Sequence, residues 1–127
     1  MGIISTKAHT VIGLVVGLVL LVAPQLFAFT DNGAATTVAV AVGIFIILSE
    51  LITKSPYSPL KLVSMKAHIV LDVVTGVFLA ASPWLFSFMD TAQNNQWVPH
   101  LIVGLMVAGY ALLTSPDDSR SSIIDRN

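Results

Sequence analysis

The sequence predicts an all-α, four-helix transmembrane bundle built from two parallel helical-hairpin repeats. Three observations lead to this fold class: an unusually apolar composition, four long apolar stretches, and a first half that recurs in the second half. The 127-residue chain is 55% hydrophobic and 10% charged, whereas about a quarter of the residues in soluble domains are charged. With a net charge of −1 and no cysteine, the composition excludes a basic nucleic-acid binder, a disordered chain and thiol chemistry.

The four apolar stretches are each long enough to cross a bilayer. They cover residues 8–29, 34–52, 67–88 and 97–114. A helix of roughly 18–22 residues spans about 27–33 Å, which matches a hydrocarbon core of ~30 Å. Residues 14–22 have no polar face, so an amphipathic helix of a soluble protein is excluded there. Helices are expected rather than strands because a helix satisfies its own backbone in lipid.

The basic residues predict the orientation. All six fall on one side of a topology with four spans: Lys7, Lys54, Lys61, Lys66, Arg120 and Arg126. By the positive-inside rule both termini are cytoplasmic, and we expect a multi-pass protein of a prokaryotic inner membrane. A signal peptide over residues 1–23 is the less favoured interpretation, because a close copy of this segment occurs in the middle of the chain.

An internal repeat divides the chain. Residues 5–31 align without gaps onto residues 64–90 with thirteen identities in 27 positions. Because each unit holds two spans, both units enter the membrane from the same side, and a pseudo-twofold axis along the membrane normal is expected. We therefore expect a first repeat over 1–56, a cytoplasmic linker over 57–63, a second repeat over 64–116 and a polar tail over 117–127.

One motif gives the repeat a family resemblance. Residues 82–84 read Ser-Pro-Trp and are followed by Leu-Phe-Ser-Phe, while residues 23–25 read Ala-Pro-Gln and are followed by Leu-Phe-Ala-Phe. This pattern, over residues 5 to about 116, resembles the SPW repeat family of small prokaryotic membrane proteins. The resemblance implies a two-helix membrane unit and no particular chemistry.

The motif residues Pro24, Ser82, Pro83 and Trp84 favour a structural role. Proline removes a backbone donor and clashes with the preceding turn, so each odd span is expected to kink or end there. Aromatic residues gather at the same level, as in an interfacial belt. We interpret the motif as a helix stop with an interface anchor. The alternative is that Trp84 lines the entrance to a ligand site.

Small residues are spaced for close helix contact. Gly13 and Gly17 form one such pair, and Gly104 and Ala108 form another. Small side chains let helix backbones approach closely in lipid. Packing within the bundle is the favoured interpretation, and self-association or docking to a larger membrane complex is the alternative.

Four ionisable residues lie within the predicted spans: His9, Glu50, His68 and Asp72. Placing ionisable side chains in lipid costs free energy. Hydrogen bonding between helices near the headgroups is the favoured interpretation, ahead of a proton or ion site and of a metal centre. Asp72 aligns with Gly13 and Glu50 aligns near Tyr110, so no symmetric site is expected.

The predicted function follows mainly by exclusion, because no familiar enzyme motif is present. We expect a non-catalytic accessory or structural membrane protein, with no metal or cofactor. Its expected partners are lipid and either a second membrane protein or another copy of itself, and not nucleic acid. The alternatives are a component of a proton- or ion-coupled transporter or channel and a membrane-embedded metal-dependent enzyme. His100, at the start of the fourth span, is expected to be interfacial.

Overall fold

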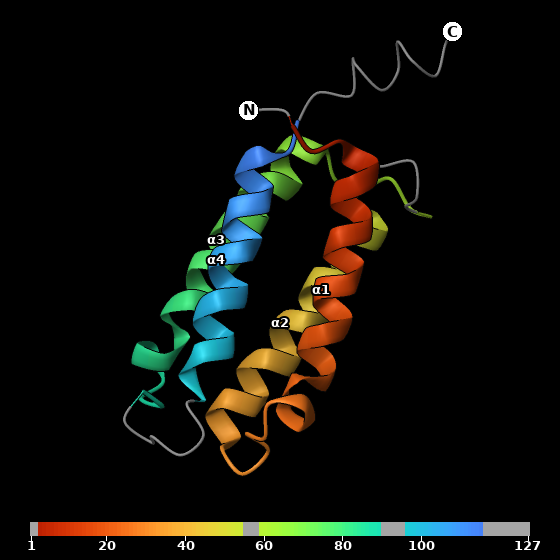
Figure 1. Ribbon diagram of the computed structural model, residues 1–127. Coiled ribbons are helices and arrows are strands. Elements are labelled where there is room, and N and C mark those ends of the chain that lie inside the picture. The colour runs from red at the N-terminus through yellow and green to blue at the C-terminus, as the bar shows by residue number, and fades with distance from the viewer. Residues whose placement is uncertain (1–2, 55–58, 90–95, 116–127) are drawn as a thin grey trace, which may run out of the picture.

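The computed structural model describes residues 3–54, 59–89 and 96–115. Within these ranges the chain forms four helices: α1 (Thr6–Leu26), α2 (Gly33–Ile52), α3 (Met65–Leu85) and α4 (Trp97–Leu113) (Figure 1). The all-α fold class is confirmed. The predicted tail over 117–127 and residues 57–58 of the predicted linker lie outside the described residues.

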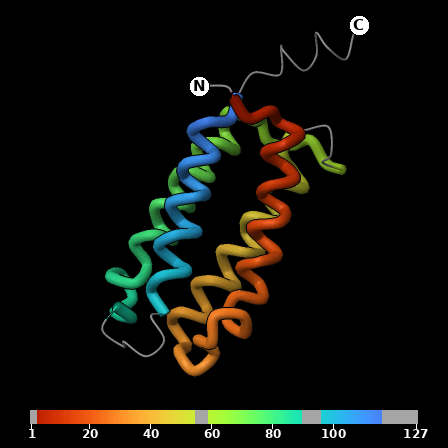
Figure 2. Tube along the Cα trace, in the orientation of Figure 1, coloured from red at the N-terminus to blue at the C-terminus, as the bar shows by residue number. Residues whose placement is uncertain are grey.

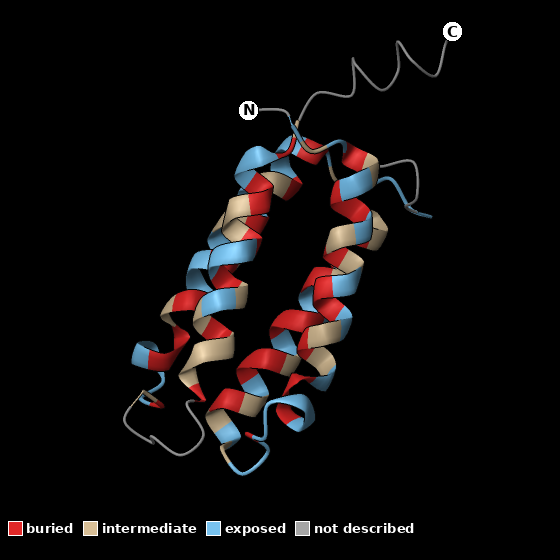
Figure 3. Ribbon diagram, viewed as in Figure 1, coloured by how far each residue is buried: buried red, intermediate tan, exposed pale blue. Residues whose placement is uncertain are grey.

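Three of these helices have the length and composition of membrane spans. Helices α1, α2 and α3 contain 21, 20 and 21 residues and are strongly apolar, whereas α4 is also apolar but contains 17 residues. The lipid-facing surface is apolar as well, with Leu18, Val74 and Leu105 each more than half exposed. Buried residues recur between exposed ones along each helix, as Figure 3 shows. The protein is therefore a multi-pass membrane protein.

The helices pack as two hairpins, α1 with α2 and α3 with α4 (Figure 2). Each hairpin crosses at a pair of glycines, Gly17 with Gly43 and Gly76 with Gly104. A Cβ added to any of these four would lie about 3 Å or less from an atom of the facing helix. Ala108 contacts Gly76 in the same crossing. The small residues of the sequence thus face the partner helix within a hairpin, where they allow close backbone approach.

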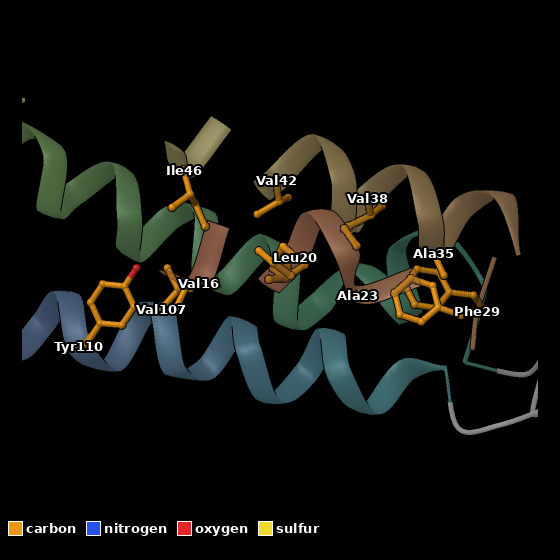
Figure 4. Close-up of a cluster of buried hydrophobic side chains, with 13 residues drawn as sticks. Val16, Leu20, Ala23, Phe29, Ala35, Val38, Val42, Ile46, Val107 and Tyr110 are labelled. Atoms are coloured by element: carbon orange, nitrogen blue, oxygen red, sulfur yellow. The ribbon is translucent and has the colours of Figure 1, made fainter. Parts of the chain in front are cut away.

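The two ends of the bundle differ in composition. We call the end where α1 and α3 begin the basic end, because the lysines of the described residues lie there, and the opposite end the aromatic end. Between them runs an apolar core drawn from both hairpins (Figure 4). Its members are Val16, Leu20, Ala23, Phe29, Ala35, Val38, Ala39, Val42, Ile46, Leu79, Phe88, Val107 and Tyr110.

The odd helices begin in the same way. Ser5 caps α1 and Ser64 caps α3, and each serine side chain accepts a hydrogen bond from the backbone N–H three residues later. Such caps satisfy donors that an α-helix leaves without partners at its start. The two caps are repeat equivalents, so each half of the sequence specifies the start of its first helix locally.

The odd helices also end in the same way, and the prolines are not where they stop. Each helix continues for two residues beyond Pro24 or Pro83. It ends because Ala28 and Ser87 adopt left-handed backbone conformations, with φ of 56° and 58°. The backbone N–H of the next residue, Phe29 or Phe88, then donates to the proline carbonyl. This is a Schellman-type stop, which satisfies the last carbonyls of a helix.

Ser82 has a specific local contact in the second repeat. Pro83 has no N–H to donate to the carbonyl of Leu79, four residues earlier. The Ser82 hydroxyl donates to that carbonyl instead, at 2.6 Å. Trp84 is 55% exposed and projects from the bundle. Ser82 therefore replaces the backbone hydrogen bond that Pro83 cannot make, whereas Trp84 lies on the outer surface of the bundle.

At the basic end the two repeats are joined through their backbones. Ile4 pairs with Thr114, and its repeat equivalent Val63 pairs with Thr53. In both cases the segment entering one repeat pairs with the segment leaving the other. These two short bridges lie directly beside the first turns of α1 and α3, which carry the candidate site.

At the aromatic end His100 is buried between the two repeats, a contact that the sequence does not indicate. Its side chain is only 1% exposed, and its ring lies 4.9 Å from the ring of Phe29 and 4.7 Å from that of Phe88. The two phenylalanines are repeat equivalents, so His100 fills the space between the two repeats. Its ring nitrogens lie 2.9 Å from the carbonyl oxygens of Gln96 and Ala35. A hydrogen bond to one of these carbonyls explains how this polar ring can be buried.

Candidate functional site: a buried centre of histidines and carboxylates

The structure brings together the four ionisable residues that the sequence singles out within the spans. His9 and His68 lie in the first turns of α1 and α3. Asp72 follows His68 by one turn, and Glu50 lies in the last turn of α2. All four side chains are completely buried. We call these four residues the buried centre.

The reactive atoms of the buried centre converge on one point. The Nε2 atoms of His9 and His68 are 3.1 Å apart. Asp72 Oδ2 lies 2.8 Å from the first nitrogen and 3.1 Å from the second. Glu50 Oε1 lies 3.4 Å and 3.0 Å from the same two nitrogens. Each carboxylate therefore contacts both imidazoles.

Two threonine hydroxyls contact the imidazoles at Nδ1, the ring nitrogen that does not contact the carboxylates. His9 Nδ1 lies 2.7 Å from the hydroxyl of Thr114, and His68 Nδ1 lies 2.6 Å from that of Thr53. Each threonine belongs to the other repeat. Sequence reasoning missed both threonines, although Thr precedes the Ser-Pro pair at the end of each even span. The extra residue Lys54 between Thr53 and Ser55 obscures this correspondence.

The pairing of these threonines changes the alignment of the even helices by one residue. With Thr53 matched to Thr114, Glu50 aligns with Ala111 and not with Tyr110. Each repeat thus supplies one histidine and one carboxylate, but the carboxylate comes from the even helix in the first repeat and from the odd helix in the second. No repeat equivalent of either carboxylate is acidic, so the carboxylate positions are asymmetric, as the sequence predicts, although each repeat contributes the same residue types.

Gly13 makes room for this exchange of positions. It aligns with Asp72, and a Cβ at residue 13 would collide with the Glu50 carboxylate. The absence of a side chain on α1 is therefore what admits the carboxylate from α2. Gly13 serves the buried centre, whereas Gly17, Gly104 and Ala108 lie at the helix crossings.

Two further polar atoms are buried at the centre. Asp72 Oδ1 and the Tyr110 hydroxyl have no hydrogen-bond partner among the described residues. The Tyr110 ring lies 5.0 Å from that of His9 and reaches from α4 toward the interior, as Figure 4 shows. Buried polar groups are normally satisfied, so these atoms mark a place where an additional ligand would find contacts.

This donor set can hold cations. One ligand atom from each of the four residues lies within 4.8 Å of every other. Two imidazole nitrogens and two carboxylate oxygens suit a divalent metal ion or shared protons. The motif residues Pro24, Ser82, Pro83 and Trp84 take no part, because they lie at the aromatic end.

Comparison with known proteins identifies the family. The SPW repeat domain matches residues 7–114, which include both hairpins and all four residues of the buried centre. The chain belongs to the SPW repeat family. The resemblance of its Ser-Pro-Trp motif is thereby confirmed. No curated protein and no solved structure matches the chain. The centre of this SPW protein is accordingly interpreted from its own geometry.

Proposed function

We propose that this SPW protein is an accessory, non-catalytic membrane protein in which a cation bound at the buried centre holds the two repeats together. We call this cation-dependent contact between the repeats the lock. The observation that carries the proposal is the convergence of two histidines and two carboxylates, completely buried and drawn from both repeats. With neutral histidines this centre would hold two uncompensated negative charges in a low-dielectric interior. Such burial is strongly unfavourable, so the fold requires a cation there.

The position of the centre supports a role as a lock. Most helix packing occurs within each hairpin, and the hairpins meet mainly through α2 and α3. At the basic end, the histidine–threonine contacts and the two backbone bridges all join one repeat to the other. Loss of the cation would weaken the contacts between repeats and leave each hairpin intact.

The burial of the centre supports a non-catalytic role. His9, Glu50, His68 and Asp72 are each 0% exposed, so a substrate would need an opening of the bundle to reach them. We propose that the protein acts by assembling with another membrane protein or with a second copy. Since the small residues are occupied within the hairpins, the contact surface would consist of the larger apolar side chains facing lipid.

The charge distribution supports an inner-membrane location with both termini cytoplasmic. In the described residues all lysines lie at the basic end, either in the first turn of α1 or α3 or in the segment that follows α2. The positive-inside rule places such an end on the cytoplasmic side. The buried centre would then lie about one helical turn below the cytoplasmic surface.

A proton- or ion-coupled transport component is the second candidate. It is favoured by the continuous series of contacts from Thr53 through His68, Asp72 and His9 to Thr114, in which each step is 3.1 Å or less. Such a series is suited to proton transfer between the repeats. Reconstituted liposomes loaded with a pH-sensitive dye test it, and proton flux that is lost in Asp72→Asn would favour transport over assembly.

The accessory role is tested by native mass spectrometry of tagged protein extracted in several mild detergents. We expect a defined oligomer or a stoichiometric complex, retained after crosslinking in intact cells. Recovery as a monomer in every detergent, with no crosslinked species in cells, would refute assembly. The lock is tested separately by Glu50→Gln, which should loosen the contacts between repeats and increase proteolysis in the linker.

A further inference from the structure

The hydrogen bonds behind the two imidazoles determine where their protons are. Thr53 Oγ1 lies 2.6 Å from the carbonyl oxygen of Ser49, and Thr114 Oγ1 lies 2.6 Å from that of Tyr110. A carbonyl oxygen only accepts, so each hydroxyl donates its single hydrogen there. Each hydroxyl oxygen must then accept from the histidine, and Nδ1 of both His9 and His68 carries the hydrogen.

The consequence concerns the opposite side of each ring. A neutral imidazole with hydrogen on Nδ1 has a lone pair on Nε2. Both lone pairs point into the buried centre, where the two Nε2 atoms are 3.1 Å apart and carboxylate oxygens surround them. Four acceptor atoms therefore face one another, and without a cation they repel.

The spacing of these atoms matches metal coordination. Adjacent ligands bound at about 2.0–2.2 Å lie about 2.8–3.1 Å apart in octahedral coordination and about 3.3–3.6 Å apart in tetrahedral coordination. The five distances between each Nε2 and its neighbours range from 2.8 to 3.4 Å. A proton joins only two of these atoms, whereas a metal ion at their centre contacts all four.

The surroundings also resemble those of a metal site. Metal-bound histidines commonly donate the second ring N–H to an oxygen that fixes the ring, as Thr53 and Thr114 do here. The free oxygen of Asp72 and the hydroxyl of Tyr110 are buried without partners, and each would gain one from a metal or its bound water. Gly13 leaves the space that Glu50 needs.

We propose that His9, Glu50, His68 and Asp72 bind a divalent first-row transition-metal ion, of the class of Zn²⁺ or Fe²⁺, through two Nε2 atoms and two carboxylates. Imidazole favours zinc and iron over magnesium and calcium, and no thiolate competes because the chain lacks cysteine. Two carboxylates and neutral histidines bring two negative charges, which one such ion balances. This assignment rests on the proposed function, in which a cation holds the two repeats together, and it specifies which cation that is.

The test is equilibrium dialysis of detergent-purified, chelator-treated protein against Zn²⁺ and, separately, Co²⁺, whose visible absorption reports its ligands. We expect one ion per chain and a rise in melting temperature on loading. His68→Gln and Asp72→Asn should abolish binding, whereas His100→Gln should retain it. His100 is the matched control, because it is an equally buried histidine at the opposite end.

Positioning by the threonines is tested with Thr53→Val and Thr114→Val. These variants keep all four ligands, so they should still bind Co²⁺ but about 10–100-fold more weakly. A role in packing alone would lower the melting temperature and leave the affinity unchanged. This measurement remains informative if a variant lacking a ligand fails to fold.

Two results would overturn the metal assignment. One is cooperative unfolding of protein that binds none of Zn²⁺, Co²⁺, Mn²⁺ or Fe²⁺. The other is binding that persists in both His68→Gln and Asp72→Asn. If no metal binds but Glu50→Gln still loosens the contacts between repeats, protons are the cation, and the lock stands without the metal. If metal binds to a protein that is monomeric in membranes, the site stands and the accessory role fails.

Discussion

The two ends of the bundle each bury histidine between the repeats, but with opposite consequences. At the basic end, His9 and His68 turn one nitrogen to a threonine hydroxyl and the other toward carboxylates. At the aromatic end, both nitrogens of His100 face backbone carbonyls, and its ring lies between two phenylalanines. His100 has no lone pair directed at a shared centre.

This difference shows that burial alone does not make a histidine a ligand. The decisive feature is the atom opposite the potential ligating nitrogen. A threonine hydroxyl already committed to a carbonyl fixes the hydrogen on Nδ1 and leaves Nε2 available. Both nitrogens of His100 instead face backbone carbonyls, and a neutral ring donates its single hydrogen to one of them. The first arrangement is suited to a cation and the second to packing.

The largest effect is expected when one imidazole of the buried centre is removed. His68→Leu leaves Glu50 and Asp72 with a single histidine between them, so two buried carboxylates lose a partner. We expect a loss of about 3–5 kcal/mol in the free energy of unfolding, as for a broken buried ion pair. Reversible unfolding in mixed detergent micelles measures it. Phe78→Leu, at a partly exposed position, is the control, and an equal effect there would contradict the comparison.

A smaller effect is expected when the space beside the centre is filled. In Gly13→Ala the new methyl group would collide with the Glu50 carboxylate. We expect a loss of about 1–3 kcal/mol from overpacking, together with weaker Co²⁺ binding. Gly109→Ala is the matched control in α4, because nothing lies within 4 Å of a Cβ there. Unchanged cobalt binding and unchanged stability in Gly13→Ala would contradict the close contact between residue 13 and Glu50.

At the aromatic end, His100→Gln should affect stability alone. The substitution removes at least one hydrogen bond to a buried carbonyl and the ring between Phe29 and Phe88. We expect a loss of about 1–3 kcal/mol in unfolding free energy, with metal content unchanged. Parallel unfolding and dialysis experiments measure both. A loss of bound metal would show that the two ends are coupled, contrary to the comparison.

The smallest effect concerns the helix stops at the aromatic end. Ala28 and Ser87 are not glycine but have positive φ, a conformation that costs roughly 1–2 kcal/mol for residues with a Cβ. Ala28→Gly and Ser87→Gly should each raise the unfolding free energy by up to about 1 kcal/mol. Thr30→Gly, in the following turn, is the control and should not stabilise. Destabilisation by both glycine variants would contradict the proposed helix stop.

Much of the fold could be predicted because its signals are local or repeat along the chain. The all-α class, the two hairpins and the SPW repeat follow from apolar length and from the recurrence of residues 5–31. The stop at each proline could be located only approximately. Proline indicates roughly where the helix ends. The left-handed residue that ends it is Ala28 or Ser87 and not glycine, so the sequence does not signal its position.

The candidate site was predictable as a set of residues and not as an arrangement. His9, Glu50, His68 and Asp72 are conspicuous because ionisable groups are rare in apolar spans. Their convergence depends on how the two hairpins face each other. The sequence likewise does not indicate that the ring of His100 lies between the equivalent Phe29 and Phe88.

By itself, the sequence determined that the helices lie in lipid and that the chain contains a repeat. The length of the apolar stretches specifies helices that cross lipid, and the identities between the two halves specify two equivalent hairpins. Only the tertiary structure decided that each histidine is held by a threonine of the other repeat and that one carboxylate comes from each half. The physical reason is that propensity and hydropathy act between neighbours in the chain. Contacts between His9 and Thr114 are fixed by the packing of whole helices, which no local pattern encodes.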